Sequence, residues 1–253
     1  MKFLQTLVSS TGFRDPAHNP DRLEVFDRLL AVVSEHDADL VVLPGGYLTV
    51  PAVQDVPGAI AELSRRADRA GIAVIGGVDV ATPSADDPKT AARDAKRAAT
   101  AALPYFGFAS GRAAFGADPG RRWQQSSSTS ANAWDVPDPD VPGPDRVVVL
   151  GTTRIGVLIC GELFSSRGRE SMAGLGLSLV VDLGHVGMGT GVTPAMENIA
   201  RNGGCAVAHA QHVGWGGSHH FVAADGVRDS VPTDELRCVG DDEFWVAWYA
   251  RTI

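Results

Sequence analysis

Lysine is scarce in this sequence, and long apolar runs are missing. Only Lys2, Lys89 and Lys96 occur among the 253 residues, and the formal net charge is -8. Because binding to nucleic acid or to a membrane surface needs clustered Lys and Arg, this balance predicts no nucleic-acid partner. No run of roughly 18 or more apolar residues occurs, so the sequence also predicts no transmembrane helix and no membrane partner.

Cysteine is rare as well. Cys160, Cys205 and Cys238 are widely spaced and odd in number, which argues against a disulfide framework and against a zinc ligand set. This usage fits a reducing compartment, so we expect a cytoplasmic protein. We also expect it to need neither a metal ion nor a cofactor.

The remaining composition is that of an ordinary globular protein. With 44% hydrophobic and 21% charged residues, the chain can build one sizeable core, and we expect a single domain over residues 1–253. Apolar β-branched runs alternate with segments of helical periodicity, which is typical of right-handed crossover units on a buried sheet. The predicted fold class is therefore α/β.

The pattern places these elements along the whole chain. Asn19 followed by Pro20 predicts a helix start with an asparagine cap, and Gly71 predicts a helix stop. Segments 81–95 and 126–145 are rich in polar residues and Pro, and we expect them to be loops. Strands are expected at 2–9, 39–44, 72–76, 99–108, 146–150, 153–159, 177–182, 205–212, 220–224 and 244–249, and helices at 19–33, 58–70, 166–175 and 193–202.

One stretch, 153–164, indicates where chemistry could occur. A buried strand is predicted to end abruptly at Cys160 and Gly161, with a turn and a helix following. Open α/β sheets present reactive groups at such strand ends, and a following helix N-terminus favours a thiolate. The alternative is that Cys160 is a small buried hydrophobic residue, as free cysteines usually are.

Histidines provide candidate partners for this thiol. His185 follows the next strand, so it should emerge at the same sheet edge as Cys160, although a histidine that only caps a strand end is an equal alternative. His209 and His212 lie three apart on a later strand and must face opposite sides. Because no His-x-x-x-His spacing occurs, the histidines do not indicate a metal site.

The order of elements and residues resembles the nitrilase, or carbon–nitrogen hydrolase, superfamily. The resemblance rests on segments 39–44, 154–160 and 196–202, and it spans about residues 1–222. It implies a four-layer α-β-β-α sandwich, a small-molecule substrate, and a homodimer or higher homo-oligomer. It also implies hydrolysis of amides or nitriles by a Cys nucleophile, a Glu base and a Lys that stabilises the oxyanion. Cys160 occupies the nucleophile position.

The other two family residues have no match in this chain. Gly45 stands where the resemblance expects the Glu base, and Gln125 stands where it expects the Lys. Glu162 matches a family acidic residue beyond the nucleophile, where it could be a supporting carboxylate or, as the minority interpretation, a substitute base. A base typically supplies about 10²–10⁴ in rate and an oxyanion donor about 10²–10³, so both losses must be compensated for activity to persist.

Two functions from different classes therefore remain. The first is a divergent thiol hydrolase in which Cys160 attacks an amide or nitrile and Glu162 or His185 transfers protons. The second is a catalytically inactive protein of the same fold that binds a small molecule or a protein partner. The second hypothesis predicts that Gly45→Glu combined with Gln125→Lys creates activity.

Candidate substrate-binding residues surround these positions. Gly45, Gly46 and Tyr47 follow a predicted strand end, where glycine leaves room for a ligand. Arg122 is a cation that could replace the missing Lys, Gln125 could donate a neutral hydrogen bond, and the backbone after Cys160 at Gly161 could serve the oxyanion.

Overall fold

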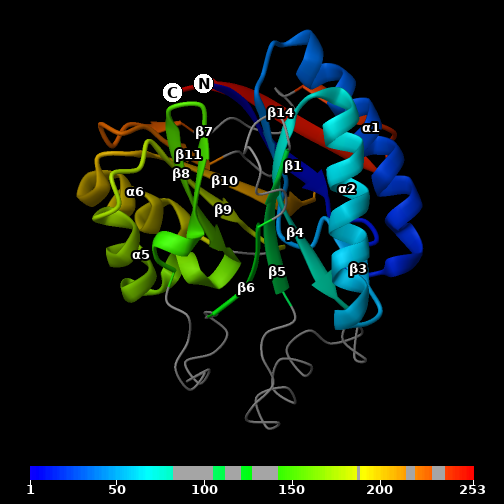
Figure 1. Cartoon of the computed structure of the whole chain (residues 1–253), viewed down its shortest axis with the longest axis horizontal. Coiled ribbons are helices and arrows are strands. Elements are labelled where there is room, and N and C mark those ends of the chain that lie inside the picture. Colours follow the sequence, from blue (N-terminus) through cyan, green and yellow to red (C-terminus); the bar gives the residue numbers. More distant parts are fainter. Residues whose placement is uncertain (82–104, 112–120, 127–141, 187–188, 215–219, 230–236) are drawn as a thin grey trace, which may run out of the picture.

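The computed structural model describes residues 1–81, 105–111, 121–126, 142–186, 189–214, 220–229 and 237–253. Most of the predicted loops at 81–95 and 126–145 lie outside these ranges. Figure 1 shows the described elements as two central blocks of strands between two pairs of helices.

The first block of strands is built around the N-terminal strand. β1 (Lys2–Ser9) pairs in parallel with β2 (Leu40–Val42), which pairs in parallel with β4 (Ala73–Val80). β4 is followed outward by two antiparallel strands, β5 (Tyr105–Ser110) and β6 (Arg121–Gln124), and also pairs with β3 (Leu48–Val50). On its other side, β1 pairs with β14 (Trp245–Thr252), which pairs with β13 (Arg237–Gly240).

The second block contains the strand that leads to Cys160. Its order is β7 (Val147–Leu150), β8 (Thr153–Ile159), β9 (Leu179–Leu183), β10 (Ala206–Val213), β11 (His220–Val222) and β12 (Arg228–Asp229). Strands β8, β9 and β10 are parallel, and β10 also pairs in parallel with β1, from Leu7 with Gln211 to Ser9 with Val213. This pairing joins the two blocks.

Three apolar clusters show that the elements form four layers. The first cluster lies between the first block and the helices α1 (Asn19–Glu35) and α2 (Val56–Ala70). The second joins the inner faces of the two blocks, and the third lies between the second block and the helices α5 (Ser166–Ala173) and α6 (Val192–Gly203). In Figure 1, α1 and α2 cover one side of the molecule and α5 and α6 the other. The predicted four-layer α-β-β-α sandwich is confirmed.

The direction of the strands determines where a site can form. Strands β1, β2, β4, β8, β9 and β10 all run in the same direction, so their C-terminal ends share one edge. The two chain termini lie together at the opposite edge, where the Met1 amino group donates to Ile253 O at 2.9 Å. The residues that follow these strands therefore lie near one another at the edge opposite the chain termini.

One local prediction is wrong, and some short strands were missed. Asn19 is the first residue of α1 rather than its cap, because its side chain pairs with the backbone of Thr49 in β3 instead. The short strands β3 and β6 were not predicted, because runs of three and four residues carry too little periodicity. Gly71 does end α2, in a left-handed conformation with φ of 73°.

Candidate active site

Cys160 begins a tight turn at the C-terminal end of β8. The buried strand ends at Ile159, and a short 3₁₀ turn, Cys160–Phe164, leads on toward α5. Cys160 has a φ of 50°, in the left-handed region that non-glycine residues adopt at a cost of roughly 1–3 kcal/mol. The surrounding structure sustains this strain at a partly exposed thiol, which is the arrangement of a nucleophile held at a sharp strand end.

His185 is brought to this thiol by strand register. Ile159 pairs with Leu183, so Cys160 and the residues after β9 emerge side by side at the shared edge. The His185 ring is 4% exposed and hydrogen-bonds the Cys160 side chain. The prediction that His185 lies at the same sheet edge as Cys160 agrees with these contacts.

A carboxylate holds the same ring from the other block of strands. His185 Nε2 lies 3.0 Å from Oδ1 and 3.0 Å from Oδ2 of Asp79, near the end of β4. Asp79 is fully buried. A backbone hydrogen bond joins the two blocks next to this pair, because Gly45 N donates to Gly184 O at 3.1 Å. Cys160, His185 and Asp79 therefore form one connected cluster.

The electrostatics of this cluster favour a protonated imidazole. Burial lowers the pKa of His185. Electrostatic interactions and hydrogen bonds with Asp79 and Cys160 raise it by more than burial lowers it, so that the pKa is about 10. His212, by contrast, has a pKa well below its usual value, because it is buried and lies near Arg22. At neutral pH His185 is thus an imidazolium beside the thiol, and His212 is neutral.

An aromatic and cationic wall covers the cluster. The Tyr105 ring lies 4.6 Å from the His185 ring, and the Phe13 ring lies 4.6 Å from the His212 ring and 5.9 Å from the His185 ring. Arg14 donates to the Tyr105 hydroxyl at 2.7 Å, and its Nε lies 4.0 Å from Asp79 Oδ2. Burial raises the pKa of Tyr105 to about 12, so its hydroxyl stays protonated.

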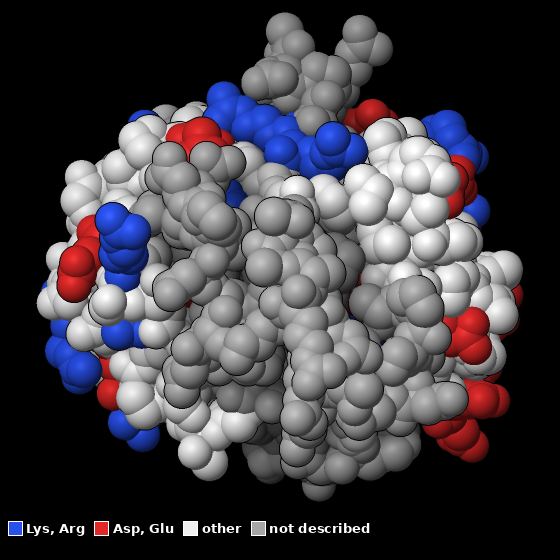
Figure 2. Space-filling model, turned by 90° about the horizontal axis from the view of Figure 1, so that it is seen from below, with Lys and Arg blue, Asp and Glu red and all other residues white. Residues whose placement is uncertain are grey.

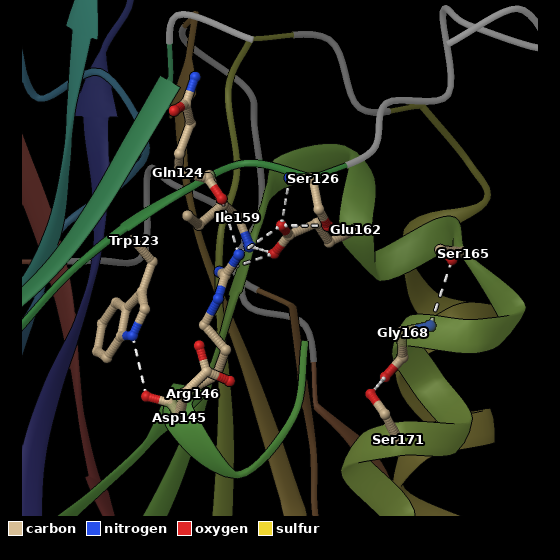
Figure 3. A network of polar contacts seen from close by, with 10 residues as sticks. All are labelled: Trp123, Gln124, Ser126, Asp145, Arg146, Ile159, Glu162, Ser165, Gly168 and Ser171. Atoms are coloured by element: carbon tan, nitrogen blue, oxygen red, sulfur yellow. Dashed lines mark hydrogen bonds and ion pairs between the residues drawn. The ribbon is translucent and has the colours of Figure 1, made fainter. Parts of the chain in front are cut away.

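Glu162 lies in a separate closed network beneath the turn. Its two carboxylate oxygens accept five hydrogen bonds: two from the Arg146 guanidinium, two from Ser126 and one from Ile159 N. Figure 3 shows these donors converging on the carboxylate. Burial raises the pKa of Glu162, whereas Arg146 and the hydrogen bonds oppose that shift. An acceptor of five hydrogen bonds has no free position for a substrate proton, so Glu162 fixes the chain on both sides of Cys160.

The predicted substrate-binding residues separate into two groups. Gly45 and Gly46 border the cluster, next to the His185 ring and the Asp79 carboxylate respectively, and Gly161 directly follows Cys160. Gln125 is buried at the end of β6, where its backbone N–H donates to Tyr105 O at 2.9 Å. The substrate-binding role of these four residues stays a prediction.

Tyr47 and Arg122 do not belong to the site, and these two predictions are corrected. The Tyr47 side chain is fully buried in the cluster beneath α1, and its hydroxyl donates to Arg22 O at 2.7 Å. Arg122 lies over the Phe106 ring and lines a groove beside α2, whereas its neighbour Trp123 faces the inner layer that contains Cys160. Alternation along β6 therefore directs Arg122 away from the thiol.

The other histidines form contacts of their own. His209 Nδ1 lies 2.6 Å from Asp182 Oδ2, and His220 Nδ1 lies 3.2 Å from the Thr193 hydroxyl. His212 Nε2 lies 3.0 Å from Gly45 O. His209 and His212 thus have different surroundings, as their spacing predicts. Among the described residues, no group of three or more His, Cys, Asp and Glu side chains is arranged to hold a metal ion.

The described residues on one face of the molecule carry charges of both signs. On the face in Figure 2, Lys and Arg side chains gather at the upper edge, and charges of both signs are scattered around the rim. No helix in the described part of the chain is long and apolar enough to cross a membrane.

Comparison with known proteins identifies the fold. No protein-family model and no curated protein matches the sequence significantly. A double mutant of the amidase from Nesterenkonia sp. AN1, in complex with acrylamide, matches with a TM-score of 0.67 at 19% identity, over 98% of this chain and 90% of that chain. Another mutant of the amidase, described as a member of the nitrilase superfamily, matches with a TM-score of 0.66 at 18% identity over 98% and 90%. This chain has the nitrilase-superfamily fold.

The comparisons concern the fold, and the nucleophile role of Cys160 stays a prediction. The amidase without its tag also matches, with a TM-score of 0.66 at 20% identity over 98% of this chain and 92% of that chain. In one mutant of that amidase, acrylamide has added to the active-site cysteine. The nitrilase fold is thus shared with proteins that carry a reactive thiol.

Sequence reasoning missed Phe13, Arg14, Asp79 and Tyr105. Phe13 and Arg14 lie in the loop after β1, and Asp79 and Tyr105 face one another in the β4–β5 register. For Asp79 the sequence offered one signal, its position between the apolar residues Val78 and Val80. A carboxylate in a fully buried strand needs a partner, so this position indicates a functional or paired group.

Proposed function

We propose that this protein is a thiol-dependent hydrolase of carbon–nitrogen bonds in small amides, with Cys160 as nucleophile and His185 as the proton-transfer group. One observation carries the proposal: an imidazole with a raised pKa is hydrogen-bonded to a cysteine in the left-handed conformation at a strand end. An imidazolium beside a cysteine favours the thiolate, which is the reactive form.

The reaction follows from the charges in the cluster. Cys160 Sγ attacks the amide carbon, so that a C–S bond forms and the carbonyl electron pair moves to oxygen. His185 then gives its proton to the amide nitrogen as the C–N bond breaks and ammonia or an amine leaves. A water molecule attacks the resulting thioester while the neutral His185 accepts its proton. The carboxylic acid then leaves, and the imidazolium and thiolate are restored.

Stabilisation of the oxyanion is assigned to groups beside the thiol. The backbone N–H of Gly161 directly follows the nucleophile, and Gln125 follows β6 and donates its backbone N–H to Tyr105 O. The Tyr105 hydroxyl accepts from Arg14 and keeps its own proton, which makes it a further donor near the charges of Cys160 and Asp79. Together these neutral donors would replace the charge of the missing Lys.

The inactive alternative is supported by Gly45 and Gln125, which lack the carboxylate and the ammonium that the resemblance implies. In that case the region around Cys160 would bind a small molecule without turnover. His185 weakens this alternative, because a proton-transfer group contacts the thiol from another strand.

Hydrolysis of short amides tests the proposal. Purified protein is incubated with acetamide, acrylamide and butyramide, and released ammonia is measured together with the mass of the Cys160 peptide. Cys160→Ala is the inactive control, and Cys205→Ala is the matched control, because Cys205 is buried beneath α6 and burial raises its pKa to about 11.

The expected result is ammonia release that Cys160→Ala abolishes and Cys205→Ala preserves. Covalent modification of Cys160 by acrylamide without ammonia release from any amide would favour the binding alternative. Equal modification of Cys160 and Cys238, with no turnover, would refute the proposal, because Cys238 is an exposed thiol outside the cluster.

A further inference from the structure

Asp79 contributes a contact that the proposed reaction does not yet use. We infer that Asp79 is a positioning residue that fixes the orientation of His185 toward Cys160, so that the three residues act as a Cys–His–Asp triad spanning both blocks of strands. This inference rests on the proposed function and assigns the group that makes His185 effective in it.

The geometry of the contact leaves the imidazole one orientation. Both oxygens of Asp79 lie 3.0 Å from Nε2 of His185, so Nε2 donates to the carboxylate. The other ring nitrogen is then left for the thiol of Cys160, with which the ring also hydrogen-bonds. A buried ring held at one nitrogen presents the second nitrogen in a fixed place, which is what proton transfer requires.

Three glycines make the space that this pair occupies. A Cβ at Gly45 would lie 2.7 Å from Leu183 O and 2.9 Å from His185 Nε2. A Cβ at Gly46 would lie 2.5 Å from Asp79 Oδ2, and one at Gly77 would lie 2.6 Å from Gly45 Cα. The absence of a side chain at Gly45 is therefore the condition for placing His185 and Asp79 there.

The titratable and charged groups around His185 come from several elements. Asp79 on β4 and Cys160 after β8 are its hydrogen-bond partners, and Asp182 on β9 interacts with it electrostatically. The Tyr105 ring on β5 lies against the His185 ring at a tilt of 51°, and burial lowers the pKa of His212 on β10. Arg14 is the second cation near Asp79, at 4.0 Å.

A second buried pair in the same molecule provides a matched control. His209 and Asp182 are fully buried and lie 2.6 Å apart on adjacent strands, where Gln211 Oε1 is the next neighbour of the ring. Asp182→Asn therefore removes a buried carboxylate–imidazole pair of the same kind and leaves the contact between Asp79 and His185 in place.

The test measures how fast iodoacetamide alkylates Cys160 between about pH 5.5 and about pH 9.5 in wild type, Asp79→Asn and Asp182→Asn. Peptide mass spectrometry separates Cys160 from Cys205 and Cys238. We expect Asp79→Asn to lower the Cys160 rate at about pH 6 by roughly ten- to a hundredfold, because a charge-assisted hydrogen bond is lost, and to change it little at about pH 9.5. Asp182→Asn should keep the wild-type profile within roughly twofold.

The inference is overturned if Asp79→Asn keeps the wild-type profile, or if Asp182→Asn shifts it equally. Should Asp79→Asn fail to fold, NMR of the histidine-labelled wild type decides: His185 must keep both ring protons up to about pH 8, and a midpoint near 6.5 would overturn the inference. A wild-type Cys160 that reacts no faster than Cys238 at about pH 6 would instead refute the proposed function itself.

Discussion

Replacing Gly45 with alanine tests directly whether the His185 position depends on an empty neighbour. The new Cβ would lie 2.7 Å from Leu183 O and 2.9 Å from His185 Nε2. Ordinary contacts need roughly 3.5 Å, so the backbone oxygen must move by about 0.8 Å and the ring by a similar amount. The hydrogen bond from Gly45 N to Gly184 O lies in the same place and would be disturbed as well.

These displacements give the size of the effect. Overpacking of this kind costs about 1–3 kcal/mol of unfolding free energy, which in a chain of this size lowers Tm by roughly 2–12 °C. A shift of about 1 Å in a reacting group can cost about a hundredfold in rate. We therefore expect Gly45→Ala to lower alkylation of Cys160 at about pH 6, and any amide hydrolysis, by about that factor.

The control is Gly58→Ala in α2, where no atom lies within 4 Å of the new Cβ. A helical glycine in open space gains about 0.5–1 kcal/mol on replacement by alanine, so Tm should rise slightly and Cys160 should react unchanged. The reasoning is refuted if Gly45→Ala melts and reacts like Gly58→Ala, because the imidazole would then not depend on the empty space at Gly45.

The other predictions concern the same cluster and its support. Gly45→Glu with Gln125→Lys should reduce rather than create ammonia release, because the new side chain would displace His185. Glu162→Gln should cost about 3–5 kcal/mol in urea unfolding, since it breaks a buried ion pair. Glu24→Gln, in an exposed pair, should cost less than about 1 kcal/mol. Because the His185 pKa is raised to about 10, its stabilising contribution is complete below about pH 6.5 and is lost as the pH rises through 10. His185→Gln should therefore lower Tm more at about pH 6 than at about pH 10.5, and an equal loss at both would contradict this assignment.

Much of the architecture could be predicted because strands of the inner layers are nearly continuous apolar runs. Strands β1 and β8 have the predicted bounds, and Cys160 was placed at the correct strand end. His185 could be found because parallel strands share an edge. The sequence pattern was enough to predict these positions because each depends on a single buried strand and on residues next to it in the sequence.

The remainder of the site depends on contacts between distant segments. Asp79 lies 106 residues from His185 in the sequence, and its strand was predicted to end before it. Arg122 was assigned to the site because the strand β6 was not recognised, so the alternation that turns it outward could not be applied. Tyr47 follows a glycine-rich strand end, but its direction is set by packing beneath α1.

The seam between the two blocks of strands has a consequence for how this molecule could work. Cys160 and His185 belong to one block, whereas Asp79 and Gly45 belong to the other, and β1 with β10 holds them in register. The proposed cluster therefore exists only when the two blocks are packed together. A substitution far from Cys160 that shifts one block against the other would separate Asp79 from His185. We expect it to abolish the proposed activity while each block stays folded.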